Sequence, residues 1–254
     1  MAVDPVVVKH CMQLESQQAE GQVVAFFDMD RTVLLGYTAT ALALEWVRRR
    51  NLGGGQSGGR KLARELLASA DRRSAGRQYT ATYRRLIRGL AGVEEAFLAD
   101  LGQAAFERSV EASLYREARQ IVRRHRELGH KVVLVTAATE YQAAPVARAL
   151  EADAVYSTRL KVAGGHITGD VVGGLCFGEG KVIAARRYLR KLGASAADAW
   201  FYSDSRDDLP LLKKVGHPVA TNPSTSLRRE AMERGWTVLD FSSRGKPNLE
   251  SVLR

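Results

Sequence analysis

The chain has 254 residues, of which 45% are hydrophobic and 26% charged, as is ordinary for a soluble globular protein. It can hold one large domain, or a core domain and a smaller one, with ample buried surface. The net charge of +10 is compatible with nucleic acid or a membrane surface as partner, but the arginines are spread along predicted helices without interleaved aromatic residues. We therefore expect solvated helix faces, no nucleic-acid partner, no membrane partner, and a positive field that favours an anionic substrate.

The cysteines and the N-terminal region bear on the cellular compartment. Cys11 and Cys176 lie far apart, which predicts free thiols in a reducing environment. Residues 1–22 lack a basic region followed by an apolar run, so we expect no signal peptide. No stretch approaches the roughly 18 apolar residues of a membrane span. These features predict a cytoplasmic protein.

The first predicted elements are a short helix and a buried strand. Residues 1–20 are weakly amphipathic, which predicts a helix over the core. Residues 23–27 are five apolar residues rich in β-branched and aromatic side chains, and they predict a fully buried strand. Asp28 and Asp30 follow directly. Because a buried strand cannot carry unpaired charge, we expect the strand to open there into a polar site at its carboxyl end.

This carboxylate pair has two chemical interpretations and one structural alternative. Asp28 and Asp30 are one residue apart, so both can face one cavity. There, one can attack a substrate while the other handles protons, or either can bind a hard cation. The alternative is a solvated turn in which Asp30 and Thr32 cap a helix. Polar residues at the ends of later strands favour the site over the turn.

Residues 37–128 predict helices and little strand structure. The expected helices span residues 37–50, 60–74, 78–91, 93–108 and 111–128. The Gly-rich run 53–59 lacks the Lys-Ser/Thr of a phosphate loop and is typical of a hinge or a mobile tip. We interpret residues 37–118 as a helical cap domain inserted into a core domain of residues 1–36 and 119–254. The alternative is that these helices belong to the core.

The second half of the chain alternates strands with helices. The predicted strands cover residues 131–135, 155–172 as a hairpin around Gly164-Gly165, 200–202, 219–220 and 236–239, and the predicted helices cover 141–151 and 178–192. Thr136 follows the first of these strands, Asp204 and Asp208 follow the strand at 200–202, and Lys181 lies at the start of the second helix. The alternation predicts an α/β fold with a doubly wound, mostly parallel sheet.

In order and spacing, the polar residues resemble the four motifs of the haloacid dehalogenase (HAD) superfamily. The D-x-D-x-T of residues 28–32 follows an apolar strand, Thr136 ends the second strand, and Lys181 precedes the D-x-x-x-D of Asp204 and Asp208. The insertion between the first two motifs resembles the small helical C1 cap of that family. The resemblance implies a Rossmann-like HAD core with an inserted C1-type cap.

Within the superfamily, the sequence resembles subfamily IB, the phosphoserine-phosphatase-like branch. Gly180-Lys181 and residues 202–211 carry this resemblance, since the last motif of that branch commonly reads G/S-D-x-x-x-D-L-P-[ML]. It implies a Mg²⁺-dependent phosphatase that hydrolyses a small-molecule phosphate ester through an aspartyl phosphate. The oligomeric state is left open.

The resemblance also implies a role for each acidic residue. Asp28 is the expected nucleophile. Asp30 is expected to protonate the leaving alcohol and then to accept a proton from the hydrolytic water. Mg²⁺ is expected between the carboxylates of Asp28 and Asp204 and the backbone carbonyl of Asp30. Asp208 is expected to hold a metal-bound water or to orient Lys181.

The remaining motif residues are expected to bind the phosphoryl group. The resemblance assigns phosphate hydrogen bonds to Thr136 and the amide of Ala137, and charge neutralisation to Lys181. A cation in the first turn of a helix is disfavoured by the macrodipole, so the position of Lys181 favours a function. The structural alternatives are that Thr136 caps the next helix and that Asp204, Asp207 and Asp208 form a solvated helix start.

The sequence departs from the phosphoserine phosphatases at three places. Arg31 replaces a small or polar residue, and Thr136-Ala137-Ala138 stands where those enzymes usually have Ser-Gly-Gly. Those enzymes also carry an early acidic residue that holds the substrate ammonium, whereas no carboxylate lies between Asp30 and Glu45 in this chain. We therefore expect little preference for phosphoserine.

Two alternative functions remain open from the sequence. A non-catalytic regulatory or interaction protein could use the basic surface, but the motif residues Asp28, Asp30, Lys181 and Asp204 are all intact. A metal-independent dehalogenase would need neither Asp30 nor Asp204. The histidines have no paired spacing, so no zinc site is expected.

Overall fold

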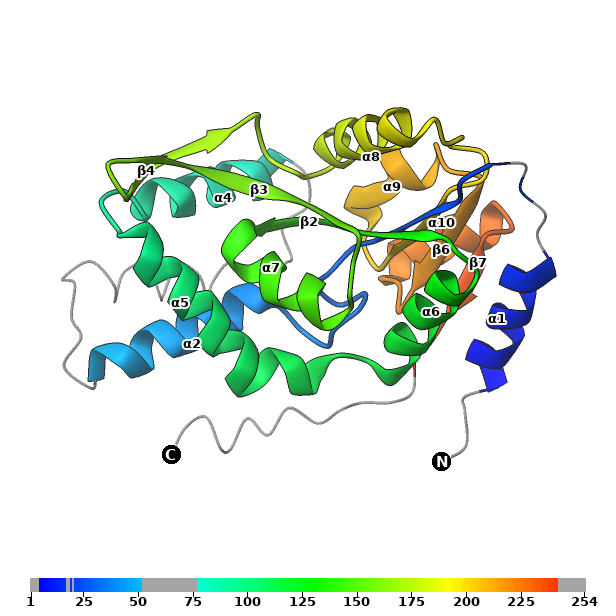
Figure 1. The fold of residues 1–254 in the computed structure, drawn as a ribbon, viewed down its shortest axis with the longest axis horizontal. Coiled ribbons are helices and arrows are strands. Elements are labelled where there is room, and N and C mark those ends of the chain that lie inside the picture. The colour runs from blue at the N-terminus through cyan, green and yellow to red at the C-terminus, as the bar shows by residue number, and fades with distance from the viewer. Residues whose placement is uncertain (1–4, 17–18, 20, 52–76, 242–254) are drawn as a thin grey trace.

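The structure, a computed structural model, describes residues 5–16, 19, 21–51 and 77–241 (Figure 1). The predicted helix at 60–74 and the Gly-rich run at 53–59 lie outside the described residues. The described part consists of one twisted sheet with helices packed around it (Figure 1).

The strand order of the sheet is β4-β3-β2-β1-β5-β6-β7. These strands are β1 (Val24–Phe27), β2 (Lys131–Thr139), β3 (Ala154–Ala163), β4 (His166–Val172), β5 (Trp200–Ser203), β6 (His217–Thr221) and β7 (Thr237–Leu239). Every neighbouring pair is parallel except β3 and β4, which form the predicted hairpin. The prediction of a mostly parallel α/β sheet is therefore confirmed, and β1 lies in its centre.

The helices cover both faces of the sheet. They are α1 (Pro5–Ser16), α2 (Thr38–Asn51), α4 (Arg77–Gly89), α5 (Glu95–Ala105), α6 (Arg116–Glu127), α7 (Glu140–Ala149), α8 (Glu179–Leu192), α9 (Leu209–Leu212) and α10 (Thr225–Glu233). Side chains of β1 alternate between the two faces, as the pleat requires. Ala25 and Phe27 belong to the apolar cluster under α1, α6 and α7, while Val24 and Phe26 belong to the cluster under α8, α9 and α10. A doubly wound sheet results.

A third apolar cluster joins α2, α4 and α5 to the β3–β4 hairpin. It includes Leu42, Leu86 and Leu98 from the helices and Leu160 and Ile167 from the hairpin. Backbone hydrogen bonds extend this contact. Gly92 and Val93, which lie between α4 and α5, pair with Ile167 of β4. The helices predicted as a cap therefore share their apolar contacts with this edge of the sheet.

Most element boundaries lie within a few residues of the sequence predictions, and two differences have a clear structural cause. The strand expected to end at Val135 continues to Thr139, with a register irregularity against β3 between these two residues. The helix expected from residue 111 begins at Arg116, because Leu114 and Tyr115 have extended backbone angles. Tyr115 N donates to Val33 O at 3.0 Å, so tertiary pairing interrupts the helix there.

Among the residues that the structure describes, no helix has both the length and the apolar character needed to cross a membrane.

Candidate active site

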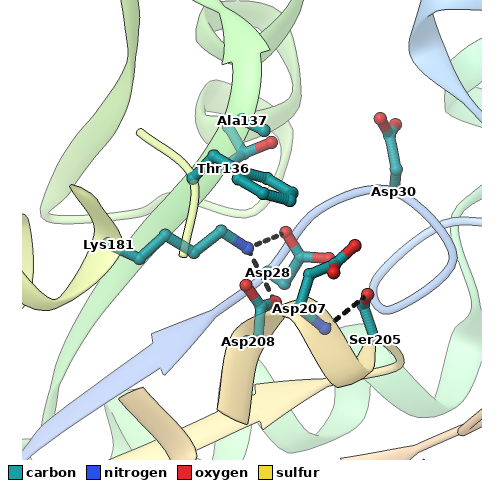
Figure 2. Close-up of a pocket in the computed structure, with 9 residues that line it drawn as sticks. Asp28, Asp30, Thr136, Ala137, Lys181, Ser205, Asp207 and Asp208 are labelled. Atoms are coloured by element: carbon teal, nitrogen blue, oxygen red, sulfur yellow. Dashed lines mark hydrogen bonds and ion pairs between the residues drawn. The ribbon is translucent and has the colours of Figure 1, made fainter. Parts of the chain in front are cut away.

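A small pocket lies at the carboxyl ends of the central strands (Figure 2). It is lined by Asp28, Asp30, Thr136, Ala137, Phe177, Lys181, Ser205, Asp207 and Asp208. The fold thus brings six of the seven predicted site residues to one pocket, and the seventh, Asp204, lies beside it at the end of β5. The empty volume is about 270 Å³, open solvent included, which is slightly below the range of roughly 300–1,000 Å³ that is typical of small-molecule sites.

Lys181 connects two carboxylates at the centre of the pocket (Figure 2). Its Nζ donates to Asp28 Oδ1 at 2.6 Å and to Asp208 Oδ2 at 2.8 Å, and its side chain is 3% exposed. Burial alone would lower the pKa of Lys181, but the negative charges of Asp208 and Asp28 raise it above its ordinary value. Lys181 therefore remains an ammonium that partly neutralises the acidic site.

The backbone at the start of α8 places Lys181 in the pocket. Gly178 precedes the helix with a φ of +52°, a conformation that glycine adopts readily. Gly180 lies so close to the carbonyl of Leu175 that a Cβ atom would overlap it. These glycines allow the helix to begin tightly against the neighbouring backbone, and Lys181 lies in its first turn.

Two serines that the sequence analysis did not identify support the acidic loop after β5. Ser203 Oγ donates to Asp208 Oδ2 at 2.6 Å and accepts from Ser205 N at 3.1 Å. Ser205 Oγ in turn accepts from Asp207 N at 3.2 Å (Figure 2). The loop is thus closed by its own side chains, and Asp208 is held toward Lys181 by two donors.

Thr32 links the first and last acidic motifs. Its Oγ1 donates to Asp28 Oδ2 at 3.3 Å and accepts from Asp204 N at 3.0 Å. The backbone N–H of Asp28 also donates to Tyr202 O at 2.9 Å, which joins the ends of β1 and β5. These two hydroxyl contacts give a physical reason for a threonine at the last position of D-x-D-x-T. The Thr32 side chain therefore joins the two motifs, whereas the alternative interpretation had it cap a helix.

Arg31 adds a positive charge beside Asp204. Its Nη1 lies 3.4 Å from Asp204 Oδ2 and donates to Tyr37 OH at 3.3 Å. The Arg31 backbone has a φ of +64°, and its N–H donates to Gly36 O at 3.1 Å in a tight turn. The Asp204 side chain is buried, while that of Arg31 is 41% exposed. The departure at Arg31 therefore places a guanidinium against an acidic motif residue.

Asp30 lies on the same pocket but its carboxylate points away from the Lys181 cluster (Figure 2). Asp30 Oδ1 accepts a hydrogen bond from Thr38 N at 2.8 Å. Thr38 is the first residue of α2, so its N–H is one of those that have no partner within the helix. A carboxylate at this end is also favoured by the helix dipole.

Thr136 and Ala137 form the β2 side of the pocket. They occupy the irregular stretch of β2, where Ala138 N donates to Thr136 Oγ1 at 3.1 Å. This local bond takes the place of regular pairing with β3, so the backbone around Ala137 is set apart from the ladder. Thr136 does not act as the N-cap of α7, a position that Thr139 occupies.

The oxygen donors of the site fit a hard divalent cation. Thr32 holds Asp28 and Asp204 together through its hydroxyl group. Asp30 follows Asp28 by two residues in the same loop, and its backbone carbonyl is the third candidate donor. Across the described ranges, no group of three or more His, Cys, Asp or Glu side chains is arranged to hold a metal. Two carboxylates with a backbone carbonyl and waters make up an oxygen-only donor set of the kind that suits Mg²⁺ rather than Zn²⁺.

A chain of two buried histidines and one half-buried histidine lies behind the site and was not foreseen from the sequence. His10 Nε2 and His125 Nε2 contact Tyr202 OH at 2.9 and 2.8 Å, and His125 Nδ1 lies 2.8 Å from His130 Nδ1. Burial lowers the pKa of His10 to about 4 and also lowers that of His125. These histidines are therefore neutral at pH 7, and they anchor α1 and α6 to β5.

Comparison with known proteins agrees with this geometry. A family profile described as haloacid dehalogenase-like hydrolase matches residues 25–213. A probable phosphatase of Mycobacterium tuberculosis is 33% identical over 228 residues, which cover 87% of this chain and 76% of that protein. A phosphoserine phosphatase of the same organism is 31% identical over 221 residues, covering 85% and 70%. The chain therefore belongs to the haloacid dehalogenase-like hydrolases.

The more particular class follows from the same relatives. The chain is a phosphatase of this family, and the resemblance to the phosphoserine-phosphatase-like branch is confirmed. A structure of a Bordetella pertussis protein of unknown function has a TM-score of 0.74 and 30% identity, covering 87% of this chain and 99% of that one. A phosphoserine phosphatase structure, titled as a phospho-aspartyl intermediate analogue, has a TM-score of 0.63 at 17% identity, covering 92% and 98%, and shares the fold.

Proposed function

We propose that this phosphatase is a Mg²⁺-dependent phosphomonoester hydrolase in which Asp28 forms an aspartyl-phosphate intermediate. The observation that carries the proposal is the buried contact of Lys181 with Asp28 and Asp208. A carboxylate nucleophile and a phosphate ester repel each other because both are anions. A buried ammonium 2.6 Å from the nucleophile reduces that repulsion where water cannot.

The proposed reaction has two displacements at phosphorus. Asp28 attacks, so that a bond from its carboxylate oxygen to phosphorus forms while the ester P–O bond breaks. Asp30 gives its proton to the leaving alcohol oxygen. In the second displacement Asp30 accepts a proton from water, the water oxygen bonds to phosphorus, and the Asp28–phosphorus bond breaks to release inorganic phosphate.

The other site residues position the phosphoryl group. Thr136 and the Ala137 amide would hydrogen-bond its oxygens, and Asp208, which accepts from both Lys181 and Ser203, would keep Lys181 in place. When bound, Mg²⁺ supplies positive charge to the transferring phosphoryl group, and Asp28, Asp204 and the Asp30 carbonyl would hold it.

We also propose that residues 37–118 form the cap domain that sets substrate choice over the core of residues 1–36 and 119–254. The roles proposed for the pocket residues concern only the phosphoryl group, which all phosphomonoesters share. Selectivity for the alcohol part must therefore come from outside the pocket. In support of this, α2 begins directly at the Asp30 carboxylate.

The proposed substrate is a small phosphorylated metabolite without a required ammonium group. The first carboxylate after Asp30 is Glu45, whose side chain is 1% exposed. It accepts hydrogen bonds from Arg48, Arg49 and Arg108. Glu45 is thus engaged within the protein and does not offer a charge to a substrate ammonium, as phosphoserine would require.

Turnover of p-nitrophenyl phosphate with and without Mg²⁺ tests the proposal. Phosphate release that EDTA abolishes and Mg²⁺ restores is the expected result. Activity that is independent of metal contradicts the Mg²⁺ assignment, but it still indicates a phosphatase, because a dehalogenase would not hydrolyse a phosphate ester. The absence of any turnover favours the non-catalytic alternative. A panel of phosphorylated metabolites then identifies the substrate class, and a strong preference for phosphoserine would contradict the argument from Glu45.

A further inference from the structure

Gln142 joins two helix starts that are far apart in the sequence. It lies in the first turn of α7, and its Oε1 accepts from Thr139 N at 3.0 Å and Thr139 Oγ1 at 2.8 Å. Its Nε2 donates to Thr38 Oγ1 at 3.1 Å. The exposed fractions of Thr38, Thr139 and Gln142 are 3%, 5% and 8%, so this connection is buried throughout.

The direction of these bonds is fixed by chemistry. A backbone N–H can only donate, so the atom of Gln142 that faces Thr139 N must be the carbonyl oxygen. The amide nitrogen of Gln142 then faces Thr38, and the Thr38 hydroxyl oxygen must accept. Replacing the Thr38 hydroxyl by a methyl group would leave a buried N–H without this acceptor.

Thr38 passes this contact on to Asp30. Its side chain accepts from Gln142, while its backbone N–H donates to Asp30 Oδ1 at 2.8 Å. A capping contact for α7 requires only the Gln142 oxygen and Thr139. The Nε2 group of Gln142 is not needed for that cap. It instead holds the start of α2, and with it the Thr38 N–H that donates to Asp30.

We propose that Thr38 and Gln142 are positioning residues for Asp30. This inference rests on the proposed function, in which Asp30 protonates the leaving alcohol. By fixing Thr38, Gln142 fixes the N–H that orients the Asp30 carboxyl group. Loss of the link impairs proton transfer to the leaving group, but it leaves Asp28, Lys181 and the attack on phosphorus intact.

Comparing kcat/KM for two substrates with different leaving groups distinguishes this inference from a general structural defect. An alkyl phosphate needs a proton on its departing oxygen, whereas p-nitrophenolate departs readily without one. In Thr38→Val we expect kcat/KM for an alkyl phosphate such as glycerol 3-phosphate to fall about tenfold or more, and that for p-nitrophenyl phosphate to fall less than about threefold. Thr38→Ser keeps the hydroxyl and should recover the alkyl phosphate activity.

Three further variants make the test decisive. Thr40→Val makes the same substitution on α2 away from the link and should show no difference between the two substrates. Gln142→Met removes the amide at similar volume, and it should reproduce the Thr38→Val pattern even if Thr38→Val does not fold. Asp30→Asn should show the same pattern more strongly.

The outcomes separate this inference from the proposed function. If Asp30→Asn reduces kcat/KM, which reports only the steps up to release of the alcohol, equally for both substrates, the assignment of Asp30 as proton donor is wrong. If Asp30→Asn distinguishes the substrates but the folded Thr38 and Gln142 variants do not, only the positioning inference is overturned. Equal losses for both substrates in these two variants also overturn it, because they indicate a general structural effect.

Discussion

The guanidinium of Arg31 lies 3.4 Å from the carboxylate of Asp204, the residue expected to bind Mg²⁺ from the end of β5. A metal ion and Arg31 would therefore compete for one buried carboxylate. Since Arg31 is 41% exposed, solvent weakens its contribution, and the pair is worth no more than about 1 kcal/mol.

From this competition we predict that Arg31→Gln binds Mg²⁺ up to about fivefold more tightly than the wild type. Isothermal titration calorimetry of the substrate-free protein measures this directly. Arg206→Gln removes the same charge from an exposed position in the neighbouring loop, and it serves as the control for net charge. Equal or weaker Mg²⁺ binding by Arg31→Gln relative to Arg206→Gln would show that the pair does not oppose the metal.

Asp28→Asn should remove hydrolysis while the protein stays folded. The amide is a poor nucleophile, so we expect phosphate release to fall by at least about a thousandfold. Lys181 keeps its contact with Asp208, and the free energy of unfolding should change by about 1 kcal/mol or less. Phosphate release and circular dichroism test the two parts. A folded variant with wild-type turnover would rule out Asp28 as the nucleophile.

Lys181→Met should destabilise the protein as well as inactivate it. The substitution leaves Asp28 and Asp208 buried without their shared cation, which costs about 3 kcal/mol of unfolding free energy. Adding Asp208→Asn removes one of the two charges and should recover part of the stability but none of the activity. Urea unfolding measures the first effect. If Lys181→Met unfolds at the wild-type urea concentration, the buried ion pairs do not contribute to stability as argued.

Acid should weaken the fold through His10. Burial holds its folded-state pKa near 4, below the unfolded value of about 6.5, so the unfolded state binds the proton more readily. The stability from neutral His10 is complete above about pH 6.5 and is lost as the pH falls toward 4. We expect a loss of roughly 2 kcal/mol from pH 7 to pH 5.

Unfolding free energies at these two pH values test the prediction. His10→Gln should lessen the difference between pH 7 and pH 5. His166→Gln, at an exposed position, should leave it unchanged. A His10→Gln variant with the full wild-type pH dependence would assign the effect to other groups.

The sequence predicted those features that depend on local patterns. Apolar runs located the central strands, and the polar residues directly after them located Asp28, Thr136 and Asp204 at one edge of the sheet. Parallel strands align their carboxyl ends, so no knowledge of distant contacts was needed. Lys181 was assigned through the resemblance to the motifs of the family, and its place at a helix start, which disfavours a cation, supported a functional role.

Features that depend on long-range contacts could not be predicted in this way. The link from Gln142 to Thr38 spans 104 positions, and that from His10 to Tyr202 spans 192. Nothing in the local sequence indicates either partner. The helix start at Arg116 was also missed, because its cause is the pairing of Tyr115 with Val33 rather than a helix-breaking residue.

The central place of β1 has a consequence for the order in which the protein matures. Val24 pairs with Lys131 and Ala25 with Trp200, so β1 leaves the ribosome before both of its neighbouring strands. Until β5 emerges, one edge of this apolar strand stays open to other chains. Such distant pairings make folding slow and favour chaperone binding during synthesis. A nascent chain arrested before Trp200 should therefore be prone to aggregation.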